Sequence, residues 1–272
     1  YDCDPKSNPV NNIIGAIFSK LGKYDKAISH YHKALDVSEN YALLHNLATA
    51  YKDDGQLLKA SEYYQKSLKL KPDFYEAIVQ LSFVKAQMCD WHETRFEKSY
   101  KSLTEGELAK TVSSPFSSLS MEDSPQRHFI RSKAYADFMF PKKIKRNVNA
   151  RRAPNKKIRI GYLSADFHNH ATMYLINGVF ENHNKSEFEI FMYSYGDDIS
   201  DEMRLSAQKN ADHFFDVRDS ANEEIAKLIR NHNIDIAIDL KGYTKQHRVS
   251  IFSFRPAPIQ ISFLGYPGTL GT

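Results

Sequence analysis

The chain has 272 residues, 42% of them hydrophobic and 26% charged, so it is long enough to bury the cores of more than one domain. Its formal net charge of +4 is too small to indicate nucleic acid binding by itself, and no apolar run reaches the length of a membrane-spanning helix. The two cysteines, Cys3 and Cys89, form neither a metal-ligand spacing nor a disulfide framework. Together with a start that lacks Met and a signal-peptide pattern, these features predict a piece of a cytoplasmic protein.

The first third carries a helical repeat. Three landmarks recur with an offset of 33 residues: Gly22, Ala27 and Tyr31 reappear as Gly55, Ala60 and Tyr64. Small residues at such places let paired antiparallel helices approach, while the aromatic ring fills the gap between pairs. The pattern resembles the tetratricopeptide repeat and predicts a repeat domain over residues 1–88, with a third unit beginning near Phe74. Such an array either offers a concave groove for an extended peptide or only extends a longer array.

Residues 89–156 are predicted to form a helical bridge and a basic linker. Trp91, the only tryptophan, is expected to pack in the junction after the repeats. A basic run extends from Lys142 to Lys157 and contains no aromatic residue on which a base could stack. We interpret this run as a solvated linker, and nucleic acid is not an expected partner.

The last third, residues 157–272, alternates strand and helix patterns. Strands are predicted over 158–163, 188–195, 213–217, 234–240 and 259–264, and helices over 173–183, 200–210, 222–230 and 248–254. The third of these strands is short, and the second helix is expected to begin at a capping Ser200. This alternation predicts a parallel sheet with right-handed crossovers, so the fold class is an α-helical solenoid followed by an α/β lobe.

Polar side chains gather in the loops after the first, fourth and fifth predicted strands. In a parallel sheet these loops emerge at one edge, which predicts a shared cleft. The residues expected to share it are Asp166, His168, His170, Tyr243, Thr244, Lys245 and Thr269. The two histidines are candidates for acid–base work or for structural roles, and Asp239 either binds a substrate hydroxyl or ties down the loop backbone. No third ligand completes a metal site, and neither a GxGxxG fingerprint nor a P-loop is present.

Several motifs occur in one order along the chain. They are Cys89-Asp-Trp91, Ile160-Gly-Tyr-Leu-Ser-Ala-Asp-Phe-His-Asn-His170, Asp239-Leu-Lys-Gly-Tyr-Thr244, Arg255-Pro-Ala-Pro-Ile-Gln260 and Leu264-Gly-Tyr-Pro-Gly-Thr269. Behind a tetratricopeptide array, this series resembles the protein O-GlcNAc transferase family, and the resemblance spans nearly the whole chain. One departure is that the family often follows its histidine with Pro and a further His, whereas this chain reads His170-Ala-Thr-Met-Tyr174.

The resemblance implies a GT-B fold, of which residues 157–272 would be the first Rossmann-like lobe. It implies transfer of N-acetylglucosamine from UDP-N-acetylglucosamine to Ser or Thr of proteins, with inversion and without a metal or other cofactor. Protein or peptide acceptors would bind through the repeat groove. Carried over by motif, the catalytic candidates are His170 and Asp239, and the substrate-binding candidates are His168, Tyr243, Thr244, Pro267 and Thr269.

The same resemblance leaves the donor open. In the family, most contacts to the nucleotide sugar come from a second lobe, for which these 272 residues show no motif, so the chain alone is expected to be inactive. The alternatives are a related protein O-fucosyl- or N-glycosyltransferase of the same fold, and a tetratricopeptide scaffold without catalysis.

Overall fold

The computed structural model describes residues 8–140 and 157–272. Its contacts divide the chain into two units, Tyr1–Tyr135 and Ala136–Thr272, and each is described by itself. Cys3 and the basic run as far as residue 156 lie outside the described residues. The predicted division of the chain at residues 88 and 156 stays a prediction. Within the described ranges, no helix is both long enough and apolar enough to span a bilayer.

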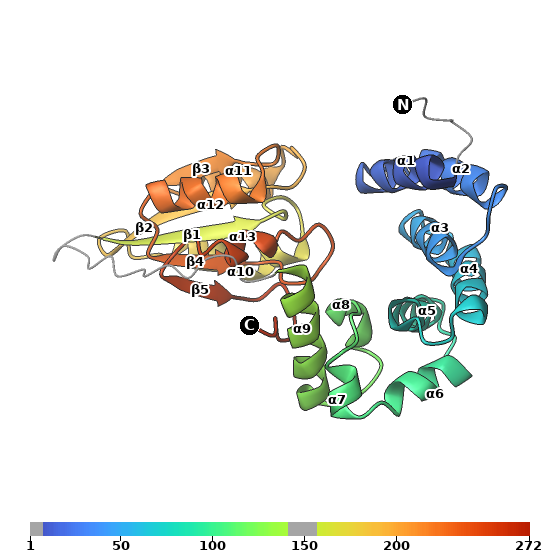
Figure 1. Cartoon of the computed structure of the whole chain (residues 1–272). Helices are drawn as coiled ribbons and strands as arrows, with labels where there is room; N and C mark the ends of the chain where they lie inside the picture. Colours follow the sequence, from blue (N-terminus) through green and yellow to red (C-terminus); the bar gives the residue numbers. More distant parts are fainter. Residues whose placement is uncertain (1–7, 141–156) are drawn as a thin grey trace. The chain divides into compact units, whose positions relative to one another are not determined.

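Five helices of the first unit follow one another as a solenoid (Figure 1). They are α1 (Asn8–Lys20), α2 (Tyr24–Leu35), α3 (Tyr41–Asp53), α4 (Leu57–Leu70) and α5 (Tyr75–Gln87), and each contacts the next. The repeat landmarks lie where the sequence predicts. Ala27, Ala60 and Tyr64 are fully buried, and the turn residues Gly22 and Gly55 have φ of 68° and 82°, a left-handed conformation that glycine adopts without steric cost. The predicted helical repeat is therefore confirmed.

The bridge forms α6 (Arg95–Lys101), α7 (Glu105–Leu108), α8 (Pro115–Ser118) and α9 (Pro125–Met139). Thr94 and Thr104 close capping boxes at the first two of these helices. The expectation for Trp91 is wrong, because its side chain is 74% exposed. Lys85, in contrast, is buried and pairs with Asp90 and Glu97.

The second unit contains a five-stranded sheet in the order β3-β2-β1-β4-β5. The strands are β1 (Ile158–Ser164), β2 (Phe188–Ser194), β3 (His213–Asp216), β4 (Ile236–Asp239) and β5 (Ile259–Ser262). Every neighbouring pair is parallel, as the sequence predicts. Leu163 near the end of β1 lies opposite Tyr193 of β2 on one side and Asp239 of β4 on the other, so three strands end at nearly the same level.

Helices cover both faces of this sheet (Figure 1). Alternate residues of β1 point to opposite faces, with Ile160 and Tyr162 in one core and Leu163 in the other. The first core is covered by α10 (Ala171–Glu181) and α11 (Glu202–Asn210). The second core is covered by α12 (Asn222–Asn231) and α13 (Ser250–Ser253). The three layers confirm the predicted Rossmann-like lobe.

The strand order reverses between β1 and β4. From β1 the chain moves outward through β2 to β3, then returns to β4 on the other side of β1 and continues to β5. At such a switch point the loops after the two central strands diverge to opposite faces, and a crevice opens outside their carboxyl ends. The loops that carry His170 and Tyr243 begin at this point.

Candidate functional site

A buried ion pair joins the two loops at the switch point. Lys241, which follows β4, places Nζ 2.9 Å and 2.7 Å from the two carboxylate oxygens of Asp166, which follows β1. The side chains are 6% and 5% exposed, so water screens this pair little. The backbone N–H of Asp166 also donates to Ser164 Oγ at 2.9 Å. The pair fixes the separation of the two loops whose side chains the sequence brings to one cleft.

His170 begins α10 as its N-cap residue. Its backbone is extended, with φ −146° and ψ 152°, and its Nδ1 accepts the backbone N–H of Thr172 at 3.2 Å. The same Nδ1 lies 3.2 Å from Thr172 Oγ1 and 3.5 Å from Asp166 Oδ2. The helix begins two residues before the predicted Met173 because this cap takes up an N–H of its first turn.

His168 lies beside His170, with ring centroids 5.7 Å apart in an edge-to-face arrangement, and it is half-buried. Between them, the backbone N–H of Asn169 donates to Asp201 Oδ2 at 2.6 Å. Asp201, and not the predicted Ser200, is the N-cap of α11. Backbone N–H groups of Asn169 and Arg204 lower the pKa of Asp201. The histidine loop is thus held from both sides, by Lys241 and by the start of α11.

Asp239 ends β4 with both carboxylate oxygens engaged. Oδ1 accepts the backbone N–H of Lys241 at 3.0 Å, and Oδ2 accepts that of Gly242 at 2.9 Å. Burial raises the pKa of Asp239 to about 6, while the two N–H groups act in the opposite direction. Of the two roles that the sequence leaves open, this geometry favours tying down the loop backbone.

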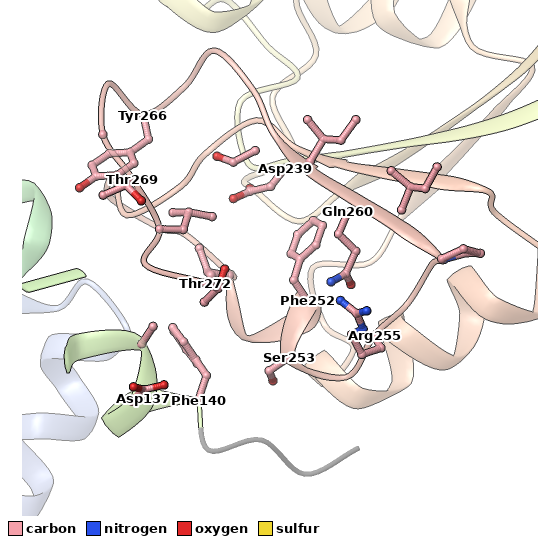
Figure 2. A pocket seen from close by; sticks show the side chains of 18 residues that line it. Asp137, Phe140, Asp239, Phe252, Ser253, Arg255, Gln260, Tyr266, Thr269 and Thr272 are labelled. Carbon is pink, nitrogen blue, oxygen red and sulfur yellow. The ribbon is translucent and has the colours of Figure 1, made fainter. Parts of the chain in front are cut away.

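A cavity of about 1070 Å³ opens beside the ends of β4 and β5 (Figure 2). Asp239 and Thr269 line it, and Figure 2 shows Gln260 and Arg255 on the other side of the hollow from Tyr266 and Thr269. The other predicted site residues do not line this cavity: they are His168, His170, Tyr243, Thr244 and Pro267. The predicted residues therefore fall into two groups, one at the switch point and one along the cavity.

The oxygens of the loop residues are bonded within the loops. Tyr243 is buried and donates its hydroxyl to Leu270 O at 2.8 Å, and Thr244 Oγ1 donates to Lys241 O at 2.9 Å. Thr269 Oγ1 accepts the backbone N–H of Gly271 at 3.2 Å. Pro267 is exposed. In this conformation these side chains shape the loops, and their assignment to substrate binding stays a prediction.

Sequence reasoning overlooked Lys241 and named Lys245 for the cleft. Lys245 is exposed, whereas Lys241 is buried and makes the ion pair. The available signal was position, because Lys241 directly follows an apolar strand that ends in Asp239, and a lysine there needs a buried partner. Among the residues that the structure describes, no group of three or more His, Cys, Asp or Glu side chains has a geometry that could hold a metal ion.

Comparisons with known proteins give the family. The model of glycosyl transferase family 41 matches residues 129–272, more than half of the chain, and the tetratricopeptide repeat model matches residues 8–73. Over 116 residues the chain is 45% identical to a probable UDP-N-acetylglucosamine–peptide N-acetylglucosaminyltransferase of Arabidopsis thaliana, covering 43% of this chain and 12% of that protein. Over 117 residues it is 38% identical to a UDP-N-acetylglucosamine–peptide N-acetylglucosaminyltransferase of Caenorhabditis elegans, covering 43% of this chain and 10% of that protein.

Among solved structures, the chain resembles an O-GlcNAc transferase of Thermobaculum terrenum, with a TM-score of 0.61 and 22% identity. The match covers 99% of this chain and 46% of that one, so the solenoid and the α/β lobe recur there in the same order. The chain thus spans about half of this structure and about a tenth of the curated relatives. The match of the family model over more than half of its length shows that this chain belongs to glycosyl transferase family 41.

Proposed function

We propose that this chain forms the acceptor side of a protein O-glycosyltransferase that moves N-acetylglucosamine from UDP-N-acetylglucosamine to Ser or Thr hydroxyls with inversion. The observation that carries the proposal is the switch point, where His170, Asp166 and Lys241 meet within the residues that the family model matches. The names of the two curated relatives support the donor. Given the cysteine pattern of the sequence, we propose the cytoplasm as the compartment.

The reaction sets the demands on such a site. The acceptor oxygen attacks the anomeric carbon from the side opposite the diphosphate, the new C–O bond forms, and the old C–O bond breaks with its electron pair leaving on UDP. The hydroxyl proton passes to a base. Catalysis therefore needs an aligned acceptor and positive or N–H groups around the leaving diphosphate. We propose that neither a metal ion nor another cofactor takes part.

The described residues supply one part of this arrangement. Arg255 is the one positively charged side chain among the described residues that line the cavity, which is too little charge for a diphosphate. The switch-point loops, in contrast, are rigidly tied by Asp239, Lys241 and Asp201. This division supports a role in positioning the acceptor and the sugar. The solenoid would then add a groove for the protein acceptor.

Transfer to Ser- and Thr-containing peptides by the full-length encoded protein tests the proposal. The protein is incubated with UDP-N-acetylglucosamine or GDP-fucose, and the intact mass of the peptides is measured. A mass increase of one N-acetylhexosamine with the first donor is the expected result, and the 272 residues alone are expected to give none. Modification from GDP-fucose only, modification of Asn, or no modification by the full-length protein would each overturn the proposed reaction.

A substitution of His170 tests whether the reaction takes place at the switch point. His170→Ala in the full-length protein is expected to lower turnover by roughly 100-fold, the range for loss of a positioned polar group at a reacting centre. Lys227→Ala is the matched control, because this exposed lysine of α12 pairs only with its helix neighbour Glu223 in the described contacts. Equal rates for the His170 variant and the control would make His170 structural.

A further inference from the structure

The N-cap of α10 is a histidine, where Ser, Thr, Asp or Asn is usual. The cap bond uses His170 Nδ1, which accepts the backbone N–H of Thr172 at 3.2 Å. A backbone N–H can only donate, so Nδ1 must present a lone pair to it. The cap bond is therefore compatible with one protonation pattern of the ring.

A neutral imidazole carries its hydrogen on one nitrogen and a lone pair on the other. With the lone pair on Nδ1, the hydrogen is on Nε2. Thr172 Oγ1 lies 3.2 Å from Nδ1, but a hydroxyl can donate to a lone pair or accept a hydrogen, and this one also donates to Asp166 Oδ2 at 3.5 Å, so it does not select a tautomer. The backbone N–H of Thr172 is therefore the group that favours the Nε2–H tautomer of His170.

The opposing influence comes from Asp166. Its Oδ2 lies 3.5 Å from His170 Nδ1 and would favour a hydrogen on that nitrogen. Lys241 Nζ, however, lies 2.9 Å and 2.7 Å from the two oxygens of Asp166, well inside the 3.5 Å that separates Asp166 from the ring. The carboxylate charge is thus directed to the ammonium, and a contact of 3.5 Å is at the outer limit of a hydrogen bond.

We propose that the cap bond of Thr172 and the Asp166–Lys241 pair together hold His170 in the Nε2–H tautomer. On the proposed function, this makes His170 a hydrogen-bond donor to a substrate oxygen and excludes it as the base that takes the acceptor proton. Its side chain is 41% exposed, and with Nδ1 occupied by the cap, Nε2 is the ring nitrogen left to meet a substrate. Asp166 and Lys241 act through the histidine and are positioning residues.

Nitrogen NMR of the 272-residue chain with ¹⁵N-labelled histidine tests the tautomer directly. The spectrum is recorded at about pH 8.5, where an ordinary imidazole is neutral, and the His170 signals are identified by their loss in His170→Gln. We expect the Nε2–H form to exceed the Nδ1–H form at least about fivefold, the ratio that an N-cap bond supplies. A majority of the Nδ1–H form would overturn the proposal.

Two substitutions of Thr172 separate the backbone cap from the side chain. Thr172→Val keeps the N–H and is expected to keep the Nε2–H majority. Thr172→Pro removes the N–H at a place in the first helical turn where proline is tolerated, and it is expected to lower the ratio of the Nε2–H form to the Nδ1–H form. An unchanged tautomer ratio in a folded Thr172→Pro chain, or a reversed ratio in Thr172→Val, would refute the role of the cap. If the proline variant does not fold, the native chain and Thr172→Val still decide.

Kinetics of the full-length protein test the role as donor. The amide nitrogen of glutamine reaches the place of Nε2 and donates a hydrogen bond, but an amide cannot act as a base at neutral pH. His170→Gln is therefore expected to keep at least about tenfold more kcat/KM than His170→Ala, and equal losses would overturn the donor role. The NMR result does not depend on glycosyl transfer, so absence of any transfer would contradict the proposed function and leave the tautomer established or refuted on its own data.

Discussion

Replacing Lys241 by Met removes the positive charge that faces Asp166 and changes the shape of the side chain little. Both side chains are at most 6% exposed, and Lys241 Nζ lies within 2.9 Å of both carboxylate oxygens. Removing one partner of a buried pair leaves an uncompensated charge and costs roughly 3–5 kcal/mol. Asp166 keeps two weaker contacts at 3.5 Å, with the Thr172 hydroxyl and with His170 Nδ1. We therefore expect Lys241→Met to destabilise the α/β unit by about 3 kcal/mol, at the low end of that range.

Two companion variants distinguish the loss of the Asp166–Lys241 ion pair from the burial of a single unpaired charge. Asp166→Asn retains an amide oxygen that can accept from Lys241 Nζ, so we expect it to cost less, about 2 kcal/mol. The double variant buries no unpaired charge and is expected to lie within about 1–2 kcal/mol of the native chain. The two substitutions are therefore strongly non-additive, as is usual for groups in contact.

Urea unfolding at neutral pH measures these values, and hydrogen exchange of peptides from β1 and β4 assigns the transition to the α/β unit. The second readout is needed because the chain has two units and need not unfold in one step. A Lys241→Met chain within about 1 kcal/mol of the native one, or a double variant that is as unstable as the sum of the single ones, would refute the view that these charges are desolvated and coupled.

Three further predictions follow from single residues. Because burial raises the pKa of Asp239 from 3.8 to about 6, the folded state binds this proton more tightly than the unfolded chain. As the pH rises from about 4 to about 6, the stability of the native chain relative to Asp239→Asn should therefore fall by up to about 3 kcal/mol, and it should stay level above pH 6. Urea unfolding measures this difference, and a difference that does not change with pH would contradict the prediction. Gly242→Ala should lower the unfolding free energy by at least about 2 kcal/mol, since φ is 54° and a Cβ would lie 2.2 Å from Tyr266 Cβ. Gly178→Ala, which has open space around it in α10, should be neutral or stabilising. Similar denaturation midpoints for the two variants would contradict this contrast. Trp91→Ala should change the unfolding free energy by less than about 0.5 kcal/mol because the ring is exposed, and a larger loss would restore the predicted packing role.

The sequence predicts the elements well where apolar periodicity is strong. The strand predicted over 158–163 is β1, Ile158–Ser164, and the helix predicted over 222–230 is α12, Asn222–Asn231. The Gly and Ala landmarks identify the repeat because small residues are needed wherever helices cross closely. The strand order β3-β2-β1-β4-β5 is not predicted. Alternation of strands and helices predicts parallel pairing, but it does not say on which side of β1 the chain returns.

The sequence predicts where the candidate site lies in the fold, but it does not predict which contacts its residues make. His170 and Asp239 do lie at the carboxyl edge of the sheet, as any residue after a parallel strand must. The pairing of Asp166 with Lys241 could not be read from spacing, since it depends on β1 and β4 being neighbours. The role of His170 as a cap could not be read from the predicted helix, which begins three residues later at Met173. The burial of Trp91 was predicted from the size of its apolar ring alone, and such rings are not always buried.

Asp166 and Lys241 are 75 residues apart, so the ribosome adds the lysine well after the aspartate. A chain synthesised at roughly 5–20 residues per second makes Asp166 about 4–15 seconds before Lys241 exists. During that interval β1 can pair with β2, but its other edge has no strand beside it and Asp166 lacks its lysine. The helices α1–α5 of the solenoid have by then been synthesised. The α/β unit thus passes through a stage with an open strand edge on every ribosome, and this stage is where we expect a nascent-chain chaperone to bind it.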